Sequence, residues 1–334
     1  MSASVCVIIA AYNAEATLLR AIGSALAEAE TAEVIVVDDA STDQTSVIAH
    51  TAAARDGRVK LITMKTNKGP GAARNAALEM AQAPFVAVLD SDDIFLPGRL
   101  RQLIACGEGE IIADNIAFVT AHTLGALDGQ DWSGLPTAFE PLDAAQFVQG
   151  NLHQPGVARG ELGFLKPLLS RAFLEQHGLR YDPALRLGED YDLYVRMLLA
   201  GARMHLTRRP GYGAMVRDGS LSASHEASDL AHLHGALDEH LRYDGVSGEL
   251  QRAMRAHLRQ VRDKRDHRIF LDLRRAKGAW AALRYALHSP RRFWTIGARI
   301  LRDKLKLSTT DNDAVPASGV RLLLPAKQMA SALR

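Results

Sequence analysis

Apolar runs alternate with helical patterns over the first hundred residues of the chain. Four of these runs are short, rich in β-branched residues and apolar almost throughout, as is typical of strands buried on both faces of a sheet. The predicted strands are residues 4–11, 33–39, 58–63 and 85–89, and the predicted helices between them are residues 14–28, 41–54 and 72–82. This alternation predicts a doubly wound parallel sheet with helices on both faces.

The rest of the chain is less regular, but its pattern indicates further elements. Strands are predicted at residues 111–120, 163–169, 202–206 and 212–216, and helices at residues 171–177 and 187–200. From about residue 228 the pattern is helical and basic, and beyond about residue 308 it has no sustained periodicity. We therefore expect an α/β domain over residues 1–225, a helical basic extension over 226–306 and a flexible tail over 307–334.

Three carboxylates follow the fourth apolar run: Asp90, Asp92 and Asp93. On extended backbone the side chains of Asp90 and Asp92 point to the same side. Carboxylates this close repel one another unless a cation or hydrogen-bond donors intervene. A divalent cation shared with a diphosphate would relieve the repulsion. A solvated acidic turn or a helix N-cap is the alternative interpretation.

Polar residues follow the other predicted strands as well. Right-handed crossovers bring the carboxyl ends of parallel strands to one edge, where open α/β sheets bind ligands. Tyr12, Asn13, Asp38 and Asp39 would lie along this edge. The chain has no GxGxxG after its first strand and no GxxxxGK[ST], so dinucleotide binding and a P-loop NTPase lose support. A phosphate ligand would need a metal at the acids and a basic group such as Arg74.

Three acids occupy the first turn of the helix predicted from residue 187: Glu189, Asp190 and Asp192. Acids at this position commonly stabilise the helix dipole, which is one interpretation. The other is that one carboxylate at the helix mouth faces the sheet edge and acts as a general base. The residue pattern leaves both open.

Two polar segments flank this helix. Residues 128–160 are punctuated by glycine and proline and contain Trp132, and residues 218–225 carry several hydroxyls and His225. Segments of this kind commonly form loops over a site. The second could fold over a diphosphate and give His225 to a metal, although a plain surface loop explains it equally well.

Charge is distributed unevenly along the chain. The 334 residues have a net charge of +2, but residues 241–306 carry 18 Lys/Arg against 6 Asp/Glu. A basic extension on an acidic body suggests an anionic partner, either a membrane or a nucleic acid. Within residues 290–305 the apolar side chains lie largely on one side of a helix, with cations around them, which is typical of an interfacial helix. These apolar residues are Phe293, Trp294, Ile296, Ile300, Leu301 and Leu305. A solvated basic helix is the alternative, and the sequence contains no recognised nucleic-acid module.

Cysteine usage and hydropathy bear on the location of the protein. Cys6 and Cys106 are the only cysteines, which fits a reducing compartment and excludes a disulfide framework. No run of about 18 apolar residues occurs, and the N-terminus does not resemble a signal peptide. We expect a cytoplasmic protein that binds peripherally to the inner face of the plasma membrane.

Five motifs recur in a fixed order over residues 4–225. They are Ala10-Ala11-Tyr12-Asn13, VVDDASTD at 36–43, NKGPGAARN at 67–75, LDSDD at 89–93 and Gly188-Glu189-Asp190. Together they resemble the family 2 glycosyltransferases of the GT-A fold, and most closely the bacterial exopolysaccharide (succinoglycan-type) members. The resemblance implies a mixed, Rossmann-like sheet whose residues 1–100 form the nucleotide-binding half and residues 101–225 the acceptor half.

The resemblance also implies a role for each matching residue. Asp190 would be the general base and Glu189 would assist it. Asp92 would coordinate Mg²⁺ or Mn²⁺ on the diphosphate, with His225 as a further ligand. Lys166 and Trp132 would contact the acceptor. The nucleotide-sugar would be bound by Ala10, Tyr12, Asn13, Asp39, Arg74, Asp90 and Ser91. Tyr12 would lie near the uracil, Asp39 at its edge and Arg74 near the base or the diphosphate. Asp90 would face the ribose or an outer metal shell.

The implied activity is metal-dependent, inverting transfer of one sugar from a nucleotide-sugar, such as UDP-glucose, to a polyprenyl-diphosphate-linked oligosaccharide in exopolysaccharide biosynthesis. Processive members carry a QxxRW motif and transmembrane helices, and this sequence has neither. A sugar-nucleotide nucleotidyltransferase is one alternative, but it would need a basic glycine-rich loop after the first strand, where the chain has Ala11-Tyr12-Asn13-Ala14. A catalytically inactive scaffold of the same fold is the other.

Overall fold

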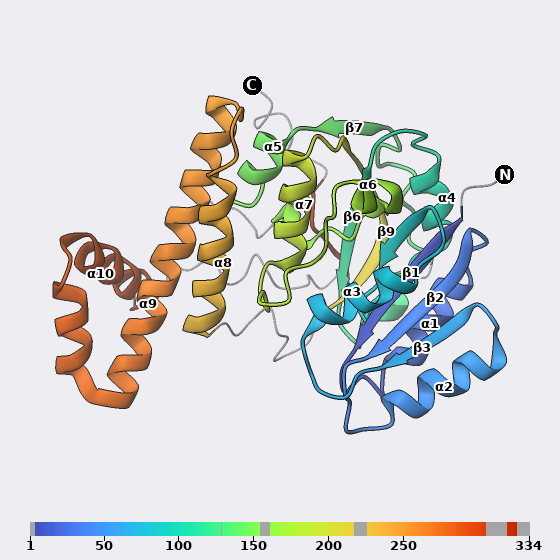
Figure 1. Cartoon of the computed structure of the whole chain (residues 1–334), viewed down its shortest axis with the longest axis horizontal. Helices are drawn as coiled ribbons and strands as arrows, with labels where there is room; N and C mark the ends of the chain where they lie inside the picture. Colours follow the sequence, from blue (N-terminus) through green and yellow to red (C-terminus); the bar gives the residue numbers. More distant parts are fainter. Residues whose placement is uncertain (1–3, 128, 154–160, 217–225, 305–318, 326–334) are drawn as a thin grey trace. The chain divides into compact units, whose positions relative to one another are not determined.

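The computed structural model describes residues 4–127, 129–153, 161–216, 226–304 and 319–325 (Figure 1). The chain divides into two compact units. The first comprises Met1–Ala144, Gly163–Asp218 and Val315–Arg334, and the second comprises Ala145–Leu162 and Gly219–Ala314. This division differs from the predicted domain bounds at two segments, because residues 145–162 join the helical unit and the C-terminal segment joins the first unit.

The first unit contains one mixed sheet and the helices packed on it. Its described elements, in chain order, are β1 (Val5–Ala11), α1 (Leu18–Leu26), β2 (Thr31–Asp38), α2 (Thr45–Arg55), β3 (Val59–Thr63), α3 (Pro70–Met80), β4 (Phe85–Val88), β5 (Ile94–Phe95), α4 (Arg99–Ile104), β6 (Ile111–Val119), η1 (Leu124–Leu127), β7 (Phe139–Leu142), β8 (Leu168–Ser170), α6 (Arg171–Gln176), α7 (Glu189–Leu199), β9 (Met204–Met215) and β10 (Arg321–Leu322). Within the described residues the sheet order is β3-β2-β1-β4-β8-β6-β9-β5, with β10 on β6 and β7 on β9.

Strands β1 to β4 form the parallel part of the sheet, as the apolar runs predict. β1 and β2 are buried along nearly their whole length, which explains why they are apolar rather than alternating. The chain steps from β1 to β2 to β3 in one direction and then crosses back to β4 on the other side of β1. Because the crossovers are right-handed, α1 and α2 cover one face and α3 the opposite face. The carboxyl ends of β1, β2 and β4 therefore meet at one edge.

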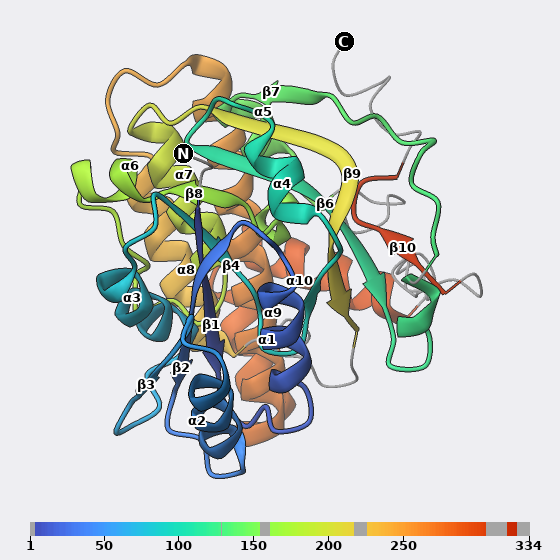
Figure 2. The ribbon, with the colours of Figure 1, turned by 90° about the vertical axis from the view of Figure 1, so that its right-hand side faces the viewer.

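The second part of the sheet is built around β6 and β9, which run parallel to each other. The prediction of two separate strands at residues 202–206 and 212–216 is wrong: β9 is continuous and curves across the sheet (Figure 2). Its register against β6 shifts on both sides of Asn115, which pairs with Pro210. This irregularity accommodates a proline inside a strand, because the ladder is already interrupted there.

The predicted flexible tail needs correction where it is described. β10 pairs antiparallel with β6, and Figure 2 shows it beside that strand. Asn115 fixes the segment further, since its Nδ2 donates to the Leu324 carbonyl and its Oδ1 accepts from the Leu324 amide, both at 2.9 Å. Residues 319–325 are thus part of the sheet unit.

The second unit is helical, as expected for the basic extension. It contains most of α5 (Ala144–Gln149) together with α8 (Ala227–His240), α9 (Gly248–Leu287) and α10 (Pro290–Lys304). Helix α9 is interrupted at Gly278, whose φ of 82° is not helical, and its ribbon turns sharply in Figure 1. Over the part of the chain that the structure describes, no helix combines the length and the apolar character needed to cross a bilayer.

The two arms of α9, before and after Gly278, form a helical hairpin that α10 follows. A buried carboxylate joins these three parts. Asp266, on the first arm of α9, has no solvent exposure. It accepts a hydrogen bond from Tyr285 Oη (3.0 Å) on the second arm and forms an ion pair with Arg291 of α10. Burial opposes its ionisation, but Arg291 and Tyr285 outweigh this effect and lower the pKa of Asp266. The hairpin is therefore held by a charge that stays ionised at neutral pH.

Candidate active site

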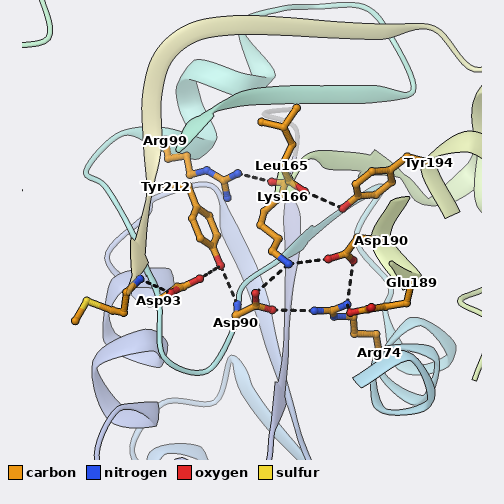
Figure 3. A network of polar contacts seen from close by, with 11 residues as sticks. Arg74, Asp90, Asp93, Arg99, Leu165, Lys166, Glu189, Asp190, Tyr194 and Tyr212 are labelled. Carbon is orange, nitrogen blue, oxygen red and sulfur yellow. Dashed lines mark hydrogen bonds and ion pairs between the residues drawn. The ribbon is translucent and has the colours of Figure 1, made fainter. Parts of the chain in front are cut away.

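Four charged side chains form a closed ring at the carboxyl edge of the sheet (Figure 3). Arg74 on α3 donates to Asp90 Oδ1 (2.8 Å) and Asp190 Oδ1 (2.9 Å). Lys166, in the segment before β8, lies 2.9 Å from Asp90 Oδ2 and 2.6 Å from Asp190 Oδ2. Each cation thus bridges the acid that follows β4 to the acid that opens α7. The ring brings together residues up to 116 positions apart.

We call Arg74, Asp90, Lys166 and Asp190 the charge ring. Glu189 adds a third carboxylate beside this ring. Its Oε1 accepts from Arg74 Nη1 at 3.0 Å. Arg74 is buried and also lies over the ring of Tyr181, 5.3 Å from its centroid. The cluster holds three carboxylates and two cations, so it carries a net charge of −1. It therefore leaves one negative charge that a cation or a proton can balance.

The local electrostatics differ from one member to the next. Burial opposes ionisation of Asp90, but Lys166 and Arg74 outweigh it and lower the pKa of Asp90 to about 2. Burial likewise opposes charge on Lys166 and Arg74, yet Asp190 and Asp90 raise the pKa of both. Burial and the adjacent Asp190 raise the pKa of Glu189. Glu189 therefore takes up a proton more readily than Asp90 does.

The backbone that carries Lys166 is clamped from two sides. Tyr194, one turn along α7 from Asp190, donates to the Leu165 carbonyl at 3.2 Å. Arg99 at the start of α4 donates to the Lys166 carbonyl, and its Nε and Nη2 pair with Asp114 of β6 at 2.8 and 2.9 Å. Both ions are almost fully buried. Lys166 is thus positioned by a second, deeper ion pair that the sequence motifs did not indicate.

The three acids of the loop after β4 have different environments. Asp93 is buried and accepts from Tyr212 Oη and from the Met215 amide, both at 2.8 Å, which ties the loop to β9. Tyr212 Oη in turn accepts from the Asp90 amide at 3.0 Å. Burial, followed by the nearby Asp90 and Asp92, raises the pKa of Asp93. Asp93 therefore shapes the loop, whereas Asp90 joins the charge ring.

Asp92 lies between these two acids and is half-buried. Its backbone carbonyl accepts from Arg20 Nη2 of α1 at 3.1 Å, which helps to fix its position. The described residues contain no group of three His, Cys, Asp or Glu side chains arranged to hold a metal. Mg²⁺, however, is commonly held by one or two carboxylates and completed by phosphate oxygens and water. The hard oxygen of Asp92 fits that mode of binding.

The residues expected around the nucleotide lie at the ends of β1 and β2. Tyr12 is 51% exposed and can be stacked upon. Asn13 has a positive φ of 49°, and its Oδ1 accepts from the Thr42 amide at 2.9 Å. Asp39 is buried, and its two oxygens accept from the Lys68 and Gly69 amides at 2.8 and 2.7 Å. Asp39 therefore holds the loop that opens α3 and carries Arg74 into the ring.

The remaining predicted residues lie in different surroundings. Ala10 belongs to β1, and Ser91 stands between Asp90 and Asp92 on the loop. Trp132, expected to contact an acceptor, packs against a hydrophobic cluster that includes Leu96, and no contact joins it to the charge ring in the described structure. His225 lies outside the described residues. The structure thus brings together Arg74, Asp90, Lys166, Glu189 and Asp190 of the predicted set.

Sequence reasoning missed the supporting residues Arg99, Asp114, Tyr194 and Tyr212. One signal was present: Asp114 is the only charged residue in a strand that is apolar apart from Asp114 and Asn115, and a charge in such a strand needs a buried partner. The partner itself could not be read from the pattern. As a whole, the site can bind an anion through its cations and accept a proton through the carboxylates of α7.

Comparison with known proteins places this arrangement in a family. The family model described as "Glycosyl transferase family 2" matches residues 6–111. "Succinoglycan biosynthesis protein ExoU" of Rhizobium meliloti (strain 1021) is 45% identical over 94% of this chain and 92% of its own length. A shorter match, 37% identical over 34% of this chain and 44% of the relative, is to "UDP-Glc:alpha-D-GlcNAc-diphosphoundecaprenol beta-1,3-glucosyltransferase WfgD" of Escherichia coli.

Solved structures agree on the fold. S. aureus TarS 1–349 in complex with UDP-GlcNAc matches with a TM-score of 0.58 at 22% identity, over 82% of this chain and 74% of that one. The mannosyltransferase PcManGT from Pyrobaculum calidifontis, in complex with GDP-Man and Mn²⁺, matches with a TM-score of 0.56 at 18% identity, over 93% and 88% of the two chains. The mixed sheet is thus the GT-A type. With the extensive identity to a succinoglycan biosynthesis protein, this shows that the chain belongs to glycosyltransferase family 2.

Proposed function

We propose that this glycosyltransferase moves one sugar from a nucleotide-sugar to a hydroxyl group of a lipid-linked oligosaccharide, with inversion at the anomeric carbon. The observation that carries the proposal is the juxtaposition of Asp90 with Asp190 through shared cations. Lys166 contacts both Asp90, at the sheet edge where a nucleotide would lie, and Asp190, in the first turn of α7. This juxtaposition supports a donor site and a base that serve one reaction centre.

In the proposed reaction Asp190 accepts the proton of the acceptor hydroxyl. The oxygen attacks the anomeric carbon as the bond from that carbon to the diphosphate breaks, and the diphosphate keeps the electron pair. A single displacement inverts the centre. Arg74 and Lys166 place positive charge beside the diphosphate, and Glu189 shares Arg74 with the base. Asp92 would hold Mg²⁺ or Mn²⁺, which when bound offsets the negative charge of the leaving group.

The relatives and the sequence support a choice of donor and acceptor. We infer a UDP-hexose such as UDP-glucose, because WfgD is named for UDP-Glc and TarS was solved with UDP-GlcNAc. The undecaprenol diphosphate in the name of WfgD and the succinoglycan role in that of ExoU support a lipid-linked acceptor in exopolysaccharide biosynthesis. The lack of a QxxRW motif in the sequence supports release after one addition.

Removal of the metal is expected to stop the reaction. Chelation with EDTA should abolish UDP release from the donor, and added Mn²⁺ or Mg²⁺ should restore it. Asp92→Asn should lower the rate at least 100-fold and should need more Mn²⁺ for half-maximal activity. Asp56→Asn is the control, because Asp56 lies just before β3, at the opposite end of the strands from Asp92, and pairs with Arg58. Full activity in EDTA would contradict a metal-dependent mechanism.

We also propose that the helical unit binds an anionic membrane surface. Residues 274–304 contain nine Lys/Arg and one Asp/Glu. On the second arm of α9, Trp280 is 84% exposed, and Leu287, about two helical turns further along, is exposed on the same side of the helix. On α10, Trp294 is 73% exposed, and Phe293 contacts it edge to face. Exposed indole rings among cations are typical of a helix lying in a bilayer interface.

The structure changes one detail of the predicted amphipathic helix. Ile296, which was expected on its lipid-facing side, is 2% exposed and packed inside the hairpin. The exposed apolar surface is instead shared between α10 and the second arm of α9. This surface is defined here as Trp280, Leu283, Leu287, Phe293, Trp294 and Leu301, and we call it the hairpin face.

Charged substitutions on the hairpin face are expected to release the protein from vesicles. Phe293→Asp with Trp294→Asp, and separately Trp280→Asp with Leu287→Asp, should weaken binding to phosphatidylglycerol-containing vesicles at least tenfold in a sedimentation assay. Tyr243→Asp is the matched control, because Tyr243 is also exposed on the helical unit but precedes α9. Unchanged sedimentation of both double variants would mean that the face packs against protein instead.

A further inference from the structure

Both carboxylate oxygens of Asp190, the proposed base, contact cations of the charge ring. Asp190 Oδ1 accepts from Arg74 Nη1 at 2.9 Å, and Oδ2 lies 2.6 Å from Lys166 Nζ. The Asp190 side chain is 8% exposed. Each oxygen of Asp190 thus already accepts a hydrogen bond from a cation, and little of the side chain is open to an acceptor hydroxyl. Movement of one cation would open an oxygen of Asp190 to that hydroxyl.

The two cations differ in how easily they can leave. Arg74 is 4% exposed, donates to three carboxylates and lies over Tyr181, so its planar guanidinium is fixed. Lys166 contacts Asp90 and Asp190 only through Nζ, at the end of a flexible four-carbon chain. Its own backbone is clamped at the Leu165 and Lys166 carbonyls. Lys166 can therefore move its charge without moving its backbone.

The exposed corner of the ring shows where a competing anion would arrive. Asp90 is 32% exposed at its side chain, whereas the side chains of Arg74, Lys166 and Asp190 are at most 11% exposed. The corner follows β4 at the carboxyl edge of the sheet, where the proposed donor diphosphate would lie. Of the two cations that contact Asp90, Lys166 is the more exposed, with 11% of its side chain exposed against 4% for Arg74.

We propose that Lys166 is a switch: while paired with Asp190 it neutralises this carboxylate, and a nucleoside diphosphate draws its ammonium away and uncovers the base. This inference rests on the proposed function. The ammonium keeps all its protons and exchanges one anionic partner, Asp190 Oδ2, for a phosphate oxygen. The freed Oδ2 then accepts the acceptor proton. Lys166 thereby acts on the donor side, rather than on the acceptor as the family resemblance implied.

The switch makes a measurable prediction about binding, independent of turnover. If UDP must take Lys166 from Asp190, then Asp190→Asn removes a competitor, and UDP should bind about tenfold more tightly in the presence of Mn²⁺. Lys166→Met should weaken UDP binding about tenfold. In the Lys166→Met background, Asp190→Asn should bring no further gain. Isothermal titration calorimetry of the four proteins forms a double-mutant cycle for this pair.

Two controls separate the switch from a general charge effect. Glu189→Gln also removes one negative charge, but Glu189 pairs with Arg74 and not with Lys166 in the described contacts, so its coupling to Lys166 in UDP binding should be much weaker than that of Asp190→Asn. Uridine, which has no phosphate, should bind Lys166→Met and wild type equally. Lys166→Gln serves in place of Lys166→Met if that variant does not fold.

The outcomes are distinguishable from one another. Additive effects of Asp190→Asn and Lys166→Met on UDP binding would overturn the switch, as would unchanged UDP affinity in Asp190→Asn alone, a variant that leaves Lys166 in place. Absence of UDP binding in the wild type with Mn²⁺ would instead contradict the proposed donor. Coupling between Asp190→Asn and Lys166→Met in UDP binding, with much weaker coupling between Glu189→Gln and Lys166→Met, would support the switch.

Discussion

Asp190→Asn should lower kcat for sugar transfer by about 10²–10⁴-fold, the usual contribution of a general base. The amide is nearly isosteric with the carboxylate but cannot accept the proton of the acceptor hydroxyl. Donor binding should survive, because Arg74 retains Asp90 and Glu189 as partners. The measurement is nucleoside diphosphate release at saturating donor and acceptor, with the folded fraction of each protein checked by circular dichroism.

Neighbouring acids on α7 provide the controls for this experiment. Asp192 occupies the same first turn but pairs with Arg196 at 2.9 Å, so Asp192→Asn should keep kcat within about threefold once corrected for any loss of folded protein. Glu189→Gln should give an intermediate loss, because Glu189 orients Arg74. If Asp190→Asn transferred sugar at the wild-type rate, Asp190 would not be the base. If only Glu189→Gln were inactive, the role would pass to Glu189.

The parallel half of the sheet was predictable because each of its strands and helices has a clear pattern of apolar and polar residues within its own segment. β1 and β2 are apolar and β-branched along their length, and their carboxyl ends carry the polar residues that the topology then gathers. β9 was not predictable, since Pro210 and Gly211 are strand breakers in most contexts. They are tolerated because the register shifts at Asn115 and because Gly211 faces Asp114 so closely that a Cβ would lie 2.1 Å from its Oδ2.

The candidate site was predictable as a set of residues but not as a set of contacts. The spacing of Asp90 and Asp92 gave the acids, and the first turn of α7 gave Glu189 and Asp190. Nothing in the pattern said that Lys166 would face both Asp90 and Asp190. Such pairings depend on the packing of α7 against the sheet, which brings segments 24 positions apart into contact. The different environments of Asp90 and Asp93 have the same origin, since Tyr212 reaches Asp93 from 119 positions away.

β10 illustrates a limit of a different kind. A strand of two residues has no periodicity to detect, so residues 307–334 gave no signal of structure. What holds the segment is the Asn115 side chain, backbone hydrogen bonds such as Leu323 N to Ile116 O at 2.9 Å, and the apolar packing of Leu322 and the buried Leu323. In the sequence, Asn115 is one polar residue in a predicted strand, and nothing indicates that it pairs with the Leu324 backbone.

Asp114→Asn should cost about 3–5 kcal/mol of unfolding free energy, because it leaves the Arg99 guanidinium buried without its counter-charge. Arg99 is 1% exposed, and Asp114 accepts its Nε and Nη2 at 2.8 and 2.9 Å. Burial raises the pKa of Asp114, and Arg99 opposes this only in part. The pair is thus costly to bury but more costly to break. Urea denaturation followed by circular dichroism measures the loss.

Two further variants show whether the loss comes from the unpaired charge. Arg101→Ala removes a cation from the same helix, but its pair with Glu30 is at the surface, with Arg101 74% exposed, so less than about 1 kcal/mol should be lost. Arg99→Leu with Asp114→Leu removes both charges, and its stability should exceed that of Asp114→Asn. The double variant can also be impaired in sugar transfer while it is folded, because Arg99 donates to the Lys166 carbonyl. Without this hydrogen bond, Lys166 is less well placed to contact Asp90 and Asp190 at the same time. Equal stability of Asp114→Asn and wild type would contradict the assignment of a buried ion pair.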